Sequence, residues 1–246
     1  MSSLRSPLLE QPTTSTGESR RASFRSGVVD KRPIHPFFVV NRKQTTSMGQ
    51  AHATTTAVRE DGKVVQACDV EILTDPRYIG SREIWPSSLV LAYAIKSEIV
   101  HVKNKVVLEL GAGLGLPSIV AETMGAKKVF VSDRVELGPI FGVNKNRLQL
   151  KVCEYKELDW LEYKDEDVPD DCDLIIGADI VYFEEQDALI GILDRLLKNN
   201  KERVFVLAYK ERTDLDRAFV NEMLDRYHCE RNYVQSSIEL YWLRAK

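Results

Sequence analysis

Strand-like and helix-like segments alternate along this sequence from residue 105 onward. Strands are expected at 105–110, 128–132, 152–155, 174–178 and 203–209, with helices at 116–124, 137–148, 184–198 and 214–227 and closing strands at 230–234 and 237–243. The middle strand segments are continuously apolar, as is typical where helices cover both faces of a sheet. This alternation predicts an α/β fold built on a doubly wound, mostly parallel sheet.

A β-hairpin is expected before the alternating region. Residues 57–60 and 63–67 would pair across Asp61-Gly62, a dipeptide that favours tight hairpin turns. Val70 and Ile72 would extend the second of these strands.

The N-terminal segment differs in composition from the rest of the chain. Its first 50 residues hold eight Lys or Arg and three Asp or Glu, whereas the remainder holds 26 and 34. The segment is rich in Ser, Thr, Arg and Pro and cannot bury enough apolar surface to offset its ordering entropy. We therefore expect a disordered basic tail over residues 1–52 and one domain over 53–246. An organelle transit peptide is the alternative for this start. Arg20-Arg21-Ala22-Ser23 resembles a basophilic kinase site, although a chance match is the simpler explanation.

Composition excludes several classes of protein. No run approaches the ~18 apolar residues of a membrane-spanning helix, and the acidic body argues against a nucleic-acid groove. The four cysteines form no C-x-x-C pair and the four histidines have no metal-ligand spacing, so no metal site is predicted. Reduced thiols indicate a cytoplasmic protein, with the nucleus as a further location. We expect a monomer.

A glycine-rich turn follows the first strand of the alternating region. The sequence Glu109-Leu110-Gly111-Ala112-Gly113-Leu114-Gly115 lets the backbone approach a ligand closely at the start of a helix. The dinucleotide fingerprint needs glycine at position 116, where Leu116 stands, so pyrophosphate binding is not expected.

Carboxylates end two of the other predicted strands. Asp133, twenty residues past Gly113, lies where a carboxylate accepts hydrogen bonds from ribose hydroxyls, although it could instead cap the next helix. Asp179 and Tyr182 form a D-x-x-Y pattern after the fourth strand. Ligands of doubly wound sheets bind at this edge.

Together these motifs resemble those of class I S-adenosylmethionine-dependent methyltransferases. The glycine turn is similar to their motif I, and D-x-x-Y is similar to a motif of the seven-strand family 16, which methylates proteins, mostly on lysine. Further similar segments are Trp85-Pro86-Ser87-Ser88, Leu158-Asp159-Trp160, Tyr182-Phe183-Glu184-Glu185 and Tyr209-Lys210-Glu211-Arg212. The resemblance covers about residues 55–246.

The resemblance implies a seven-stranded Rossmann-like sheet, S-adenosylmethionine as cofactor and a protein substrate. The residues in the family's cofactor-binding positions are Trp85, Gly111, Ala112, Gly113, Asp133, Trp160 and Ala178. Glu109 would support the glycine turn from beneath. Asp179 would orient the acceptor amine and Tyr182 would form a wall of the acceptor channel.

Methyl transfer to an amine is a direct displacement that needs alignment and a neutral nucleophile, but no metal. Burial lowers the pKa of a lysine amine and releases its proton. We expect a protein lysine methyltransferase. The alternatives are a small-molecule methyltransferase, an enzyme acting on protein histidine or arginine, and a non-catalytic cofactor-binding module.

Overall fold

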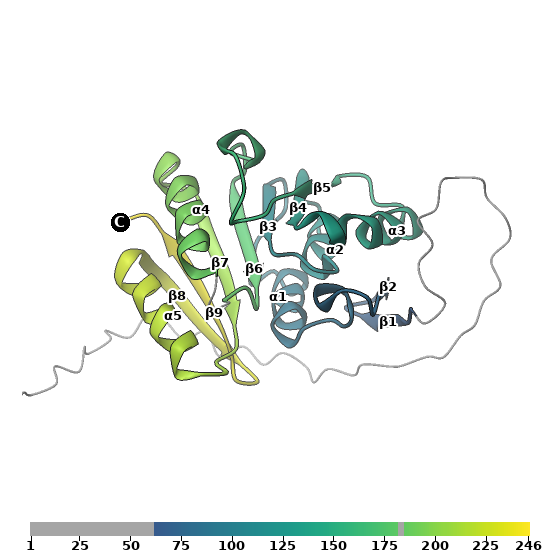
Figure 1. The fold of residues 1–246 in the computed structure, drawn as a ribbon, viewed down its shortest axis with the longest axis horizontal. Coiled ribbons are helices and arrows are strands. Elements are labelled where there is room, and N and C mark those ends of the chain that lie inside the picture. The colour runs from purple at the N-terminus through teal and green to yellow at the C-terminus, as the bar shows by residue number, and fades with distance from the viewer. Residues whose placement is uncertain (1–61, 182–184) are drawn as a thin grey trace, which may run out of the picture.

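A seven-stranded sheet forms the centre of the molecule in a computed structural model that describes residues 62–181 and 185–246 (Figure 1). The strands are β3 (Val106–Leu110), β4 (Lys128–Asp133), β5 (Cys153–Glu157), β6 (Leu174–Ala178), β7 (Val204–Tyr209), β8 (His228–Gln235) and β9 (Ile238–Arg244). Their order is β5-β4-β3-β6-β7-β9-β8. The pairs from β5 to β7 are parallel, and β9 is antiparallel to both β7 and β8. The predicted mostly parallel, doubly wound sheet is confirmed.

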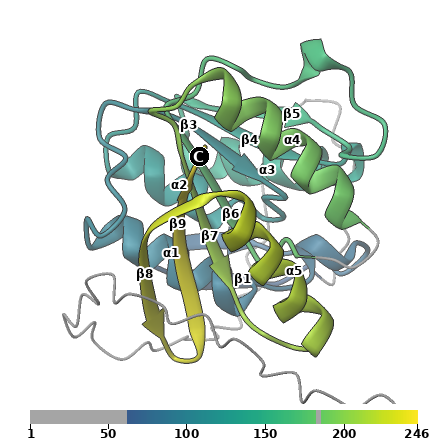
Figure 2. The same cartoon turned by 90° about the vertical axis from the view of Figure 1, so that its left-hand side faces the viewer.

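Helices cover both faces of this sheet (Figure 2). They are α1 (Pro86–Lys96), α2 (Leu116–Thr123), α3 (Gly138–Leu148), α4 (Gln186–Asn199) and α5 (Asp214–Arg226). One buried cluster joins α1, α2 and α3 to one face, and a second joins α4 and α5 to the other. Neighbouring residues of β7 belong to different clusters: Val206 belongs to the first and Phe205 to the second. The continuously apolar strands therefore serve two cores.

The structure contains an N-terminal hairpin, and it corrects the prediction that Val70 and Ile72 continue the strand of residues 63–67. The structure pairs β1 (Val64–Ala67) with β2 (Val70–Leu73), so Val70 and Ile72 belong to a separate strand. Cys68 and Asp69 form the turn with φ of 50° and 65°, the two positive values that match the twist of a tight hairpin. Residues 57–60, predicted as the first strand, lie outside the described residues, as does the predicted tail.

The topology reverses direction at β3. From β3 the chain passes to β4 and β5 on one side and later returns to β6 and β7 on the other. Such a switch point leaves a crevice outside the carboxyl ends of the strands, where ligands of doubly wound sheets bind.

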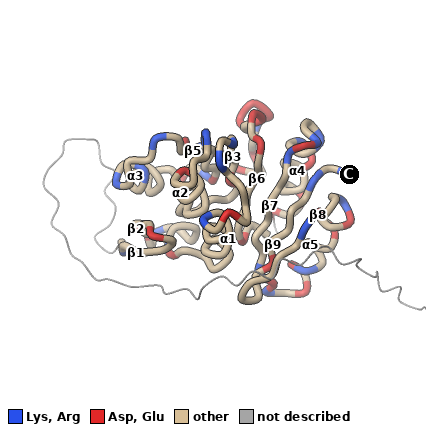
Figure 3. Tube along the Cα trace, turned by 180° about the vertical axis from the view of Figure 1, so that it is seen from behind, with Lys and Arg blue, Asp and Glu red and all other residues tan. Residues whose placement is uncertain are grey.

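Charge is unevenly spread over the surface. Acidic side chains gather in the connection between β5 and β6, which includes a short 3-10 helix at Asp165–Asp167 (Figure 3). Within the described ranges, no helix is both long and apolar enough to cross a bilayer.

Candidate functional site

The glycine turn after β3 forms the floor of a pocket at the switch point. Gly113 has φ of +57°, and a Cβ placed on it would lie 2.7 Å from the carbonyl oxygen of Gly80. Only glycine fits both this backbone conformation and this close approach. Gly115, with φ of +72°, precedes the first residue of α2, and its N–H donates to the Ala112 carbonyl at 2.8 Å.

Glu109 supports this turn from beneath, as predicted from the motif. Its buried carboxylate accepts hydrogen bonds from the Ser118 N–H at 3.0 Å and from the Ser118 hydroxyl. Burial raises the pKa of Glu109 to about 8, although the two donors of Ser118 oppose that rise. The side chain ties the end of β3 to the first turn of α2.

Asp133 ends β4 beside the turn. Its Oδ2 accepts from the Gly113 N–H at 2.7 Å and its Oδ1 from the Arg134 N–H at 2.8 Å. Burial raises the pKa of Asp133, and these two donors oppose the rise. The Asp133 side chain caps no helix: Arg134 precedes the following 3-10 helix (Val135–Leu137) without a side-chain cap.

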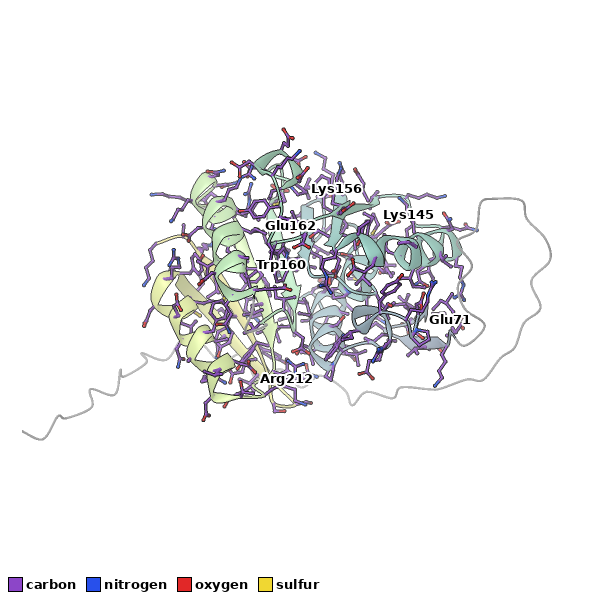
Figure 4. The ribbon with its side chains drawn as sticks, in the orientation of Figure 1. Glu71, Lys145, Lys156, Trp160, Glu162 and Arg212 are labelled. Atoms are coloured by element: carbon purple, nitrogen blue, oxygen red, sulfur yellow. The ribbon has the colours of Figure 1, made fainter. Side chains whose placement is uncertain are left out.

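Two tryptophans and the end of β6 line the same pocket. Trp160 is 7% exposed and lies 3.3 Å from a Cβ placed on Gly111. Trp85 precedes the first residue of α1, and Ala178 is the last residue of β6. Figure 4 shows Trp160 near the centre of the molecule, between the sheet and α4.

The pocket has a volume of about 380 Å³, within the roughly 300–1,000 Å³ usual for cofactor and ligand sites. It brings together all seven residues predicted to bind the cofactor: Trp85, Gly111, Ala112, Gly113, Asp133, Trp160 and Ala178. That they contact the cofactor remains a prediction.

The charge of the pocket favours a cationic ligand over a phosphate. Its lining includes six acidic residues, Glu83, Glu109, Asp133, Glu136, Asp159 and Glu185, and two basic ones, Arg77 and Arg134. Glu109, whose pKa is about 8, adds little of this negative charge at neutral pH. Phosphates are bound by basic side chains and by N–H groups. A sulfonium cofactor with a free amino group suits an acidic lining.

The two predicted catalytic residues have different outcomes. Asp179 directly follows Ala178, is 2% exposed and has φ of +55°. Aspartate adopts this left-handed conformation more readily than most residues. The Asp179 N–H donates to the Ala208 carbonyl at 2.9 Å, which fixes it at the edge of the sheet. Tyr182 lies outside the described residues, as do residues 183 and 184.

Sequence reasoning missed one wall of the pocket. Residues 77–80 line it, within a loop closed by two hydrogen bonds of 2.7 Å, from the Asp75 N–H to the Ser81 carbonyl and from the Ser81 hydroxyl to the Asp75 carbonyl. Asp75 is fully buried and binds the Arg77 guanidinium. The segment carries no motif, so no signal in the sequence marked it.

Sequence reasoning also missed the partner of Asp179. Arg212 approaches the Asp179 carboxylate with Nη2 2.9 Å from Oδ2. Neither oxygen of Asp179 has a hydrogen-bond donor within the described residues, so Arg212 pairs with this carboxylate through charge.

Comparison with known proteins identifies relatives of the chain. A family model described as lysine methyltransferase matches residues 68–226. Protein N-lysine methyltransferase METTL21A of Danio rerio is 32% identical over 167 residues, covering 66% of this chain and 75% of the relative. METTL21A of Xenopus tropicalis is 30% identical over 185 residues, covering 72% and 83%.

A solved structure has the same fold at low sequence identity. The 16S rRNA N2 G1207 methyltransferase of T. Thermophilus, in complex with AdoMet and guanosine, has a TM-score of 0.54 and 16% identity. The match covers 75% of this chain and 50% of that one.

Proposed function

Since this chain belongs to the lysine methyltransferase family and is therefore an S-adenosylmethionine-dependent protein lysine methyltransferase, we propose how its residues share the reaction. The pocket at the carboxyl ends of β3, β4 and β6 holds the cofactor, and Asp179 orients the lysine amine of a protein substrate. The seven predicted cofactor residues that line this pocket support the first part.

The chain holds the cofactor by shape and charge. The glycine turn leaves room for a ligand against the backbone, and Asp133 offers acceptors for ribose hydroxyls. Trp160 presents a largely buried ring as an apolar wall. When bound, S-adenosylmethionine supplies a methyl group on a positively charged sulfur.

The chain must also prepare the nucleophile. A lysine ammonium has a pKa near ~10.4 and no free electron pair until it loses a proton. Once the ammonium is bound beside Asp179, its desolvation lowers that pKa, although the carboxylate opposes the change, and water takes the proton. Asp179 then accepts a hydrogen bond from the neutral amine and points its free electron pair toward the pocket. The D-x-x-Y pattern predicts that Tyr182, which lies outside the described residues, walls the acceptor channel.

One observation carries the role of Asp179: a buried carboxylate, without a hydrogen-bond donor in the described part of the chain, adjoins a wall residue of the cofactor pocket. Burying a charged group is costly unless it is paired. In the described structure the Arg212 guanidinium is the cation beside this carboxylate, and the amine of an acceptor lysine would satisfy it in the same way.

Asp179→Asn tests the proposal. The variant should bind S-adenosylmethionine nearly as the wild type does in calorimetry, but transfer labelled methyl groups to a protein extract about 100-fold more slowly, because alignment is lost. Asp187→Asn, on the exposed first turn of α4, is the matched control and should transfer normally. Normal transfer by Asp179→Asn would disprove the role, and failure of the wild type to bind the cofactor would disprove the pocket.

The acceptor is tested by product and by pH. Mass spectrometry should find the label on lysine, and the rate should rise toward alkaline pH as the amine loses its proton. A histidine acceptor would level off near neutrality, and an arginine would show no plateau in the accessible range. Label on a small molecule alone would reject a protein acceptor.

A further inference from the structure

Three segments meet at the Asp179 carboxylate. Asp179 follows β6, Arg212 lies in the connection between β7 and α5, and Trp85 precedes α1. The Arg212 Nη2 is 2.9 Å from Asp179 Oδ2, and its guanidinium carbon is 5.5 Å from the centroid of the Trp85 ring. The Arg212 guanidinium therefore contacts the proposed acceptor-orienting residue and lies over the ring of a pocket-lining residue. Figure 4 marks Arg212 below Trp160 in that view.

The parallel pairing of β6 and β7 produces this meeting. Ala178 and Ala208 are register partners, so both strands end at the same edge of the sheet. The residues that follow them, Asp179 and the 210–213 connection, leave the sheet side by side.

Neighbouring contacts hold the backbone around Arg212. Thr213 begins α5 with a reciprocal pair of hydrogen bonds to Asp216, and Glu211 pairs with Arg217 at 2.5 Å. The Arg212 side chain itself is 38% exposed, whereas the carboxylate side chain that it covers is 2% exposed. The guanidinium is thus the solvent-facing cover of a buried anion.

We propose that Arg212 takes the place of the acceptor ammonium on Asp179 in the free enzyme and is exchanged for the lysine when substrate binds. This rests on the proposed role of Asp179. The carboxylate is then paired with a cation both before and after substrate binds, which avoids the cost of a buried unpaired charge. The displaced guanidinium can remain over the face of the Trp85 ring, where the cation–π interaction is favourable.

The exchange makes Arg212 a specificity-determining residue. A neutral acceptor cannot replace a guanidinium on a carboxylate without leaving that charge unpaired, whereas a lysine side chain arrives as a cation. The affinity for a cationic acceptor is reduced by the fraction of enzyme in which Arg212 occupies the site.

The probe is n-butylammonium, which reproduces the end of a lysine side chain, with n-butanol as its neutral counterpart. Each is titrated into the full chain saturated with S-adenosylhomocysteine. Affinity is measured by calorimetry in every variant, and in the wild type the indole N–H NMR signal of Trp85, one of three tryptophans and assigned with Trp85→Phe, reports movement of the Arg212 guanidinium. Because Arg212 lies over this ring, displacement of its guanidinium shifts the signal.

Arg212→Ala should bind n-butylammonium about two- to fivefold more tightly than the wild type, the size of effect that part-exposed ion pairs give. Arg212→Lys keeps the competing charge and should resemble the wild type. Lys210→Ala removes a charge from the same connection that has no ion pair in the described structure, and it should also resemble the wild type. In the wild type, n-butanol should leave the Trp85 signal unchanged.

Equal or weaker n-butylammonium binding by Arg212→Ala, with an unchanged melting temperature, would overturn the exchange, as would no binding to either protein. A wild-type response to n-butanol equal to that of n-butylammonium would also overturn it. Asp179→Asn separates the two proposals. If that variant binds the probe as the wild type does, Asp179 is not the acceptor site. If it loses binding while Arg212→Ala gains none, only the exchange fails.

Discussion

Gly113 combines a left-handed backbone with contact to a neighbouring loop. A Cβ there would meet the Gly80 carbonyl oxygen at 2.7 Å, and that backbone atom cannot move aside cheaply. A side chain at position 113 would therefore clash with the pocket wall formed by residues 77–80, whether or not a ligand is bound.

We expect Gly113→Ala to weaken S-adenosylmethionine binding at least tenfold and to lower the free energy of unfolding by about 1–3 kcal/mol, because both strain and displacement are imposed. Gly142→Ala is the control: it lies inside α3, and a Cβ there meets nothing within 4 Å. That variant should be neutral or slightly more stable. Calorimetry and denaturant unfolding measure both quantities. Unchanged binding by Gly113→Ala would mean that the turn does not form the cofactor floor.

Glu109 gives the molecule a measurable pH dependence. Burial raises its pKa from 4.5 to about 8 in the folded state. Between these values the folded protein holds a proton that the unfolded chain has lost, so stability falls as the pH rises. The contribution is fully present below about pH 4.5 and is lost once the pH passes about 8.

Glu109→Gln should remove this dependence, because the amide stays neutral and its oxygen can still accept from Ser118. Between pH 5 and 8 the wild type should lose on the order of a few kcal/mol relative to this variant. Glu222→Gln, on the exposed side of α5, should follow the wild type. The free energy of unfolding in urea, measured across this pH range, tests the prediction. Parallel curves of this free energy against pH for wild type and Glu109→Gln would contradict the raised pKa.

Single residues were predictable from sequence where a motif ends a strand. Gly111, Gly113 and Asp133 follow apolar segments whose type and length fix their place at the sheet edge. Arg212 belongs to a segment, residues 209–212, that the family resemblance also singled out. Its pairing with Asp179, however, depends on how the 210–213 connection folds against β6. Nothing in the local sequence encodes that approach.

Helices and strands were likewise predictable where the local sequence determines them, and not where contacts with distant residues do. The parallel strands were predicted because each is an apolar run separated from the next by a helix. The turn at Cys68-Asp69, which follows from the pairing of Ala67 with Val70, was missed because residues 63–72 were expected to form one strand after Asp61-Gly62. Packing of Ile72, which is fully buried, selects that register over the local preference.

One side chain attaches the hairpin to the rest of the fold. Asn144, fully buried in α3, accepts from the Leu73 N–H at 2.7 Å and donates to the Leu73 carbonyl at 2.8 Å. It pairs both backbone groups at the end of β2, directly before the loop that forms the pocket wall.

Asn144→Ala should leave both groups of Leu73 unpaired and cost about 1–3 kcal/mol of unfolding free energy. Cofactor affinity should fall as well, because the 77–80 wall is no longer anchored. Asn146→Ala, two residues later on the exposed side of α3, should change neither quantity. Loss of stability with full cofactor affinity would show that the wall is held independently of the hairpin.

At the scale of the whole molecule, the strand order explains why one pocket collects residues from distant parts of the sequence. Strands β4 and β6 flank β3 although β5 and an acidic connection separate them in the chain. The sequence predicted the alternation and the edge at which ligands bind. The sequence did not predict the order of the strands, because periodicity does not specify which strands are neighbours.

A boundary of the folded unit near residue 53 remains a prediction. The described core and pocket are built from residues after position 61, and the family match begins at residue 68. The basic, Ser- and Thr-rich residues 1–52 lack apolar periodicity, so we predict that they add little to folding.

Deleting residues 1–52 should leave the melting temperature within about 2 °C, corresponding to less than ~1 kcal/mol for a domain of this size. It should also leave cofactor affinity unchanged. Extending the deletion through residue 73 removes Ile72 and the partner of Asn144, and should cost several degrees and most cofactor binding. If the shorter deletion already unfolds the protein, the N-terminal segment is part of the domain; if the longer one is harmless, the hairpin is not what anchors the pocket wall.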